Sequence, residues 1–174
     1  MEETLRSEII QYLVDKYHRL GKVQLQKTIY FLQEVFQVPT GYDYVMHYYG
    51  PYSFDLDDTL SEMQGNGVLS INHILYPAGY IGYDISLGKN ARSDLKLASK
   101  YKDKVDQVVN IFKPMDAQTL ELWATIHFVN SILDEKGKDS SKETVVREVN
   151  LLKPKFSEKD IENNYNEMQN KGLL

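Results

Sequence analysis

The chain has 174 residues, of which 42% are hydrophobic and 26% charged, with a formal net charge of −5 and no cysteine. This composition is enough for a folded core, and it excludes disulfides, thiolate metal sites and cysteine nucleophiles. No apolar run approaches the 18 to 20 or so residues that span a bilayer, and the acidic start, MEETLRSEII, is unlike a signal peptide. We therefore expect a cytoplasmic protein.

Two helices are predicted in the first 36 residues. Apolar residues recur at helical spacing from Leu5 to Leu20, and Gly21 is placed as a helix C-cap. A second repeat with the same period runs from Leu25 to Phe36. The two helices should pack together as a tight pair.

The next segment, between Lys27 and Lys89, contains no lysine or arginine but nine of the thirteen tyrosines. Residues 42–49 have the composition of a strand, and a helix is expected from Asp55 to Gln64. Two β-prone runs then flank a turn and predict a hairpin over 68–87. This order is that of a winged helix, with 55–64 in the place of the recognition helix and the hairpin as the wing.

The remaining residues are predicted to be helical. The apolar pattern indicates one long helix over 95–112 and another over 116–133. Ser140 and Ser157 each have the spacing of an N-terminal capping box and should begin two shorter helices.

The predicted fold class is mainly α with a small β-sheet, an α+β protein. Its N-terminal half, residues 1–88, is a winged-helix-like module with an acidic, tyrosine-rich surface, and its C-terminal half, 89–174, is a helical module. A short echo between 62–69 and 167–174 would fit a partial second helix-turn-helix packed on the first. Repeated use of a glycine C-cap explains the same echo more simply.

Three motifs resemble a known family. They are LQKTIYFLQ at Leu25–Gln33, YGPYS at Tyr49–Ser53 and LLKPKFS at Leu151–Ser157. Together they resemble the YwgA-like proteins of bacteria and archaea and, more distantly, the Panacea domain of SocA-type antitoxins. The more distant resemblance implies neutralisation of a toxin or its delivery to a protease.

No motif for catalysis or for metal binding occurs in the sequence. The four histidines lack metal-ligand spacing, and phosphate loops and nucleophile elbows are absent. Asp58 and Glu62 would share a helical face and suit a hard cation, but a solvated helix face explains them more simply. We expect no catalytic residue, no metal, no cofactor and no enzymatic activity.

The acidic helix and the tyrosines before it form the predicted partner-binding site. A helix that reads DNA needs cations, whereas carboxylates complement a basic protein. Tyrosine is also frequent at binding surfaces. The leading hypothesis is an antitoxin-like or regulatory neutraliser that binds a basic toxin or nuclease, or a protease. The predicted contact residues are Tyr49, Tyr52, Asp55, Asp57, Asp58 and Glu62.

Two alternatives stay open. One is a winged-helix transcriptional regulator that binds DNA through Lys96, Lys100, Lys102 and Lys104, although these lysines alternate with aspartates as on a solvated face. The other assigns the tyrosine-rich surface to a homodimer contact. No membrane partner is expected.

Overall fold

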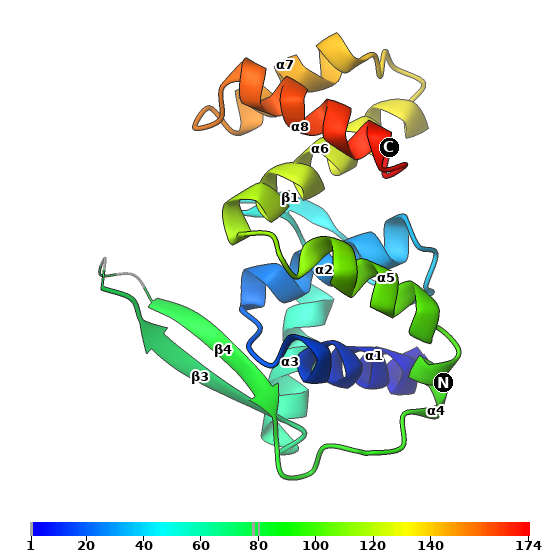
Figure 1. The fold of residues 1–174 in the computed structure, drawn as a ribbon, viewed down its shortest axis with the longest axis vertical. Coiled ribbons are helices and arrows are strands. Elements are labelled where there is room, and N and C mark those ends of the chain that lie inside the picture. The colour runs from blue at the N-terminus through cyan, green and yellow to red at the C-terminus, as the bar shows by residue number, and fades with distance from the viewer. Residues whose placement is uncertain (1, 78, 80) are drawn as a thin grey trace. The chain divides into compact units, whose positions relative to one another are not determined.

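The computed structural model describes residues 2–77, 79 and 81–174 and confirms a mainly α-helical α+β fold (Figure 1). Among these residues, no helix is both long and apolar enough to cross a membrane. The elements in chain order are α1 (Glu2–Tyr17), α2 (Lys22–Glu34), β1 (Val45–His47), β2 (Gly50–Tyr52), α3 (Phe54–Gly65), β3 (Leu69–Leu75), β4 (Ile81–Leu87), α4 (Lys96–Ser99), α5 (Lys102–Phe112), α6 (Ala117–Glu135), α7 (Lys142–Leu152) and α8 (Glu158–Asn170).

The chain divides into two compact units. The first comprises Met1–Val45 and Tyr52–Met115, and the second comprises Met46–Pro51 and Asp116–Leu174. This division differs from the predicted boundary after residue 88, because α4 and α5 pack against α1, and α5 also packs against α2. A short central segment of the chain also belongs to the second unit, which the sequence does not indicate.

Aromatic packing explains why α5 belongs to the first unit. Val105, Val108 and Phe112 on this helix are buried. The Phe112 ring stacks on Phe31 of α2, with 4.4 Å between the ring centroids. Periodicity predicts that α5 has an apolar face, but not which helix covers that face.

The turn between α1 and α2 differs from the prediction. α1 ends at Tyr17, and His18 takes the left-handed conformation, with φ 63°, while its N–H donates to Val14 O at 3.1 Å. Gly21 is therefore not the C-cap of α1 but the N-cap of α2. Positive φ is uncommon for residues other than glycine, although histidine adopts it more readily than most. The sequence therefore gives no clear signal that the helix ends before His18.

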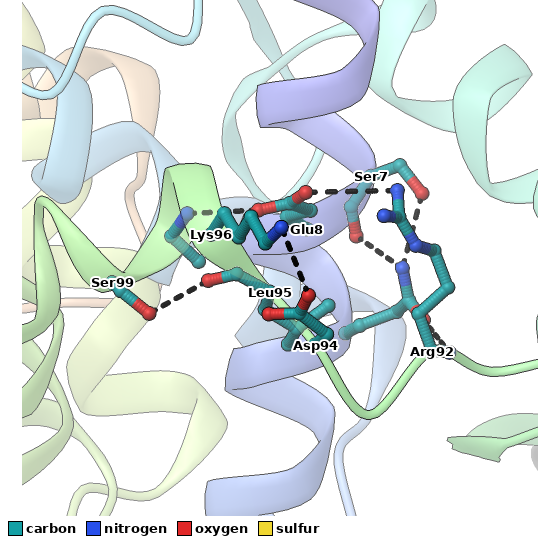
Figure 2. A network of polar contacts seen from close by, with 9 residues as sticks. Ser7, Glu8, Arg92, Asp94, Leu95, Lys96 and Ser99 are labelled. Carbon is teal, nitrogen blue, oxygen red and sulfur yellow. Dashed lines mark hydrogen bonds and ion pairs between the residues drawn. The ribbon is translucent and has the colours of Figure 1, made fainter.

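The predicted long helix over 95–112 is interrupted after Ser99 and resumes at Lys102. Figure 2 shows how α4 is held: Glu8 of α1 lies between Arg92 and the backbone of α4. One carboxylate oxygen of Glu8 accepts from Ala98 N at 3.0 Å, and the other lies 3.7 Å from Arg92 Nη1. Glu8 is buried, so its bond to Ala98 N anchors the first turn of α4 to α1.

The strand predicted over 42–49 is only Val45–His47, and it pairs with β2. Its first half is replaced by contacts with α2, because the Gln33 side chain donates to Tyr42 O and accepts from Tyr42 N at 2.9 and 2.8 Å. These two bonds occupy the backbone groups that a strand neighbour would use.

The predicted hairpin is present as an antiparallel β3–β4 pair. Its register runs from Leu69↔Leu87 to Leu75↔Ile81, and Figure 1 shows it projecting from the helices of the first unit. Only its inner end is covered: Ile85 is buried, and its N–H donates to Leu20 O at 2.9 Å.

In the second unit, α6, α7 and α8 pack on one another around Trp123, whose ring nitrogen donates to Asn164 Oδ1 at 2.7 Å. The predicted cap at Ser157 is confirmed, since its side chain accepts from Asp160 N. The cap of α7 is Ser141 rather than Ser140, because Ser140 donates to Asp134 instead.

Candidate functional site

The helix α3 is held firmly by its first turn and by its inner face. Ser53 caps it by accepting from Leu56 N at 3.2 Å. Gln26 of α2 fixes the cap itself, donating to Ser53 O at 2.9 Å and accepting from Ser53 N at 3.0 Å. Leu56, Leu60 and Met63 are buried beneath the helix. These contacts define which side of α3 faces solvent.

The outer side of α3 carries Asp55, Asp58 and Glu62, and we call these three residues the acidic face. Their spacing of three and four residues places them on one side of the helix, and all three are exposed. Within the described part of the chain, none of the three forms an ion pair. The acidic face therefore presents three carboxylates without a neighbouring cation.

Asp57 has a different environment from the acidic face. It is half-buried and forms an ion pair with Lys22 Nζ. Burial, together with the hydrogen bond to Asp57, raises the pKa of Tyr52 well above its usual range. The Lys22 Nζ also lies 5.1 Å from the centroid of the Tyr83 ring. Asp57 and Tyr52 thus contribute to an internal cluster that joins α2, α3 and β4.

The remaining predicted tyrosine lies in the other unit. Tyr49 is 58% exposed in the segment Met46–Pro51, beside Tyr48, which is 82% exposed. The predicted partner-binding residues are therefore divided: Tyr52 and the four acidic residues belong to the first unit, and Tyr49 belongs to the second.

A buried charge cluster in the second unit was not predicted from the sequence. Lys153 is buried and lies 3.2 Å from Glu121 Oε1, which is also buried. It donates to His47 O at 3.1 Å and to Tyr48 O. Lys155 approaches Glu121 Oε2 at 2.8 Å. The only sequence signal was that both lysines lie in the LLKPKFS motif.

The four lysines of the DNA-binding alternative are mostly engaged with their neighbours. Lys96 lies 3.4 Å from Asp94, and Lys104 donates to Gln37 O at 3.4 Å. Lys102 donates to Asp106 at 2.7 Å, and this bond raises the pKa of Lys102. Lys100 lies in the turn between α4 and α5. The break between these helices means that the four lysines do not share one helical face.

No group of three or more histidine, aspartate or glutamate side chains is placed to hold a metal ion in the ranges that the structure describes. The pKa of His127 on α6 is lowered to about 4 because burial disfavours its charged form.

The helices and the two small hairpins define a mainly α-helical α+β protein in which each unit has its own charged cluster. The chain is similar to YwgA of Bacillus subtilis (strain 168), an uncharacterised protein, with 27% identity over 135 residues, which is 76% of this chain and 79% of YwgA. This similarity supports the YwgA-like character that the motifs indicate. No protein-family model matches the chain.

Proposed function

We propose that the protein is a non-enzymatic binding module for a basic protein and that the acidic face of α3 is its principal contact. The observation that carries the proposal is the exposure of Asp55, Asp58 and Glu62 on one side of a helix whose other side is held in the core. Like charges this close destabilise a helix, and a cationic partner would relieve their repulsion.

Phe54 supplies an apolar anchor for the same contact. Its side chain is 58% exposed at the first position of α3, next to Asp55. The Tyr52 ring holds it edge-on at 5.2 Å between the centroids. Aromatic residues positioned in this way are typical anchors of protein interfaces.

The order of α1, α2, α3 and the β3–β4 hairpin supports a winged-helix interpretation, in which α3 occupies the recognition-helix position. Three unpaired carboxylates there would repel a phosphate backbone, so we favour a protein partner over DNA. Combined with the distant resemblance to the Panacea domain, this favours an antitoxin-like or regulatory neutraliser whose partner is a basic toxin or nuclease.

The test is to recover the partner and then to change the acidic face. The tagged protein is purified from its own host at low salt, co-purifying protein and nucleic acid are identified, and the affinity of the recovered basic protein is measured by calorimetry. The variant Asp58→Lys/Glu62→Lys should raise Kd by about 100-fold or more, because loss of close charge pairs across an interface weakens binding by this order.

The matched control is Asp15→Lys/Glu135→Lys, which makes the same change in net charge at exposed positions near the ends of α1 and α6. It should leave Kd within about twofold. Equal affinity for wild type and Asp58→Lys/Glu62→Lys would disprove the contact surface. Recovery of a DNA fragment alone, with affinity falling steeply as salt rises, would favour the regulator instead.

A further inference from the structure

The second unit contains a pocket that the proposed function does not use. Its volume is about 650 Å³. The segment between β1 and β2 forms one wall, and the end of α7 with the loop after it forms the other. The lining residues are Met46, His47, Tyr48, Leu152, Lys153, Pro154 and Lys155.

The charge at the base of this pocket is unbalanced. Lys153 and Lys155 share the single carboxylate of Glu121. Lys153 forms an ion pair with Glu121 and donates to the carbonyls of His47 and Tyr48. Lys155 contacts one oxygen of Glu121, its Nζ lies 5.0 Å from the centroid of the Phe156 ring, and its side chain is 45% exposed. The cluster therefore has one positive charge in excess, and the accessible part of that charge is at Lys155.

The walls of the pocket are apolar and exposed. The Tyr48 side chain is largely open to solvent, Leu152 is 50% exposed, and Pro154 completes the rim. Concave apolar walls with one well-placed polar group are the usual composition of a small binding site.

We propose that this pocket binds a peptide segment in which an apolar side chain adjoins a carboxylate. The apolar group would lie against Tyr48 and Leu152, and the carboxylate would accept from the free N–H groups of Lys155. The second unit carries more acidic than basic residues, so one excess cation suits a single carboxylate better than the repeated phosphates of a nucleic acid. The proposal concerns the second unit and does not depend on the acidic face of α3.

The experiment uses the full chain and the labelled peptide fluorescein-GGFDFGG-amide, followed by fluorescence anisotropy. Saturable binding is expected, and the asparagine peptide, GGFNFGG-amide, should bind at least about fivefold more weakly because it lacks the charge-assisted bond. The variants Leu152→Ser and Lys155→Gln should weaken binding of the aspartate peptide by a similar factor.

The chain offers a close control for each variant. Leu151 is 71% exposed but does not line the pocket, and Lys159 is exposed on α8, so Leu151→Ser and Lys159→Gln should bind as wild type does. All four changes are at exposed positions, and circular dichroism confirms that each variant is folded. The proposal is overturned if the peptide shows no saturable binding at about 1 mM protein, or if the two peptides bind with equal affinity. It is also overturned if the control variants bind the aspartate peptide as weakly as the test variants do, or if a labelled oligothymidine binds when the peptide does not.

Discussion

In the first unit, Asp57 is paired with one lysine, Lys22, whereas in the second unit Glu121 is paired with two, Lys153 and Lys155. The first cluster is neutral, so the unpaired carboxylates on the outside of α3 make its surroundings acidic. The second cluster keeps one positive charge in excess. The two internal clusters therefore differ in net charge.

The two clusters also differ in depth. The side chains of Lys22 and Asp57 are 26% and 31% exposed, whereas those of Lys153 and Glu121 are 7% and 3% exposed. Water screens the first pair and hardly reaches the second. Breaking a shallow pair costs little, but breaking a buried pair leaves an uncompensated charge in the interior. Substitutions in the deeper cluster should therefore have the larger effects.

Removal of the buried cation should have the largest effect. Lys153→Met leaves the carbonyls of His47 and Tyr48 without this donor and the buried Glu121 with only Lys155, and it should lower the free energy of unfolding by about 3 kcal/mol or more. Urea denaturation followed by the fluorescence of Trp123, the single tryptophan, reports on this unit. The control, Lys159→Met, should change the free energy of unfolding by less than about 0.5 kcal/mol. If Lys153→Met and Lys159→Met lower the free energy of unfolding equally, burial of Lys153 does not make it important for stability.

A buried carboxylate in the first unit provides the corresponding test there. Glu8→Ala removes the acceptor of Ala98 N and should cost about 2 kcal/mol, since a buried N–H is left unsatisfied. Hydrogen exchange of the Ala98 amide should also become faster. Glu3→Ala, at an exposed position of the same helix, is the control and should change neither measurement. An unchanged exchange rate would contradict the role of Glu8 in anchoring α4.

Acid should weaken the second unit through His127. Its pKa falls from 6.5 to about 4 in the folded protein, so between these values the unfolded chain binds a proton that the folded chain does not. Stability is therefore present above pH 6.5 and is lost as the pH falls, by about 2 kcal/mol between pH 6.5 and 4.5.

The measurement is urea denaturation at several pH values, again followed by Trp123. His127→Gln should reduce the slope of stability against pH in this window. Identical slopes for wild type and His127→Gln would contradict the burial effect.

The shallow pair should give the smallest effect. Asp57→Asn weakens the bond to Lys22 and should lower stability by about 1 kcal/mol, as measured by thermal unfolding. Asp58→Asn, one residue along the same helix, should be neutral or slightly stabilising because it reduces repulsion on the acidic face. If Asp58→Asn lowers stability more than Asp57→Asn does, then Asp58 and not Asp57 is the carboxylate that stabilises the fold.

The amino-acid sequence by itself determined the elements that depend on near neighbours. Apolar spacing predicts α2, Ser157 caps its helix as the capping-box spacing indicates, and the turn residues predict the β3–β4 hairpin. The sequence also predicts the acidic face, because residues three and four positions apart on a helix always lie on one side. These features arise from contacts within a few residues, where pattern and geometry are directly linked.

Tertiary structure alone decided the features that depend on distant partners. Glu8 binds the first turn of α4, Gln33 shortens the strand predicted over 42–49, and Lys22 pairs with Asp57. Lys153 likewise binds the carbonyls of a segment more than 100 residues earlier in the chain. Each outcome depends on which distant side chain bonds to a given polar or charged group. The periodicity of the sequence contains no information about these long-range pairs.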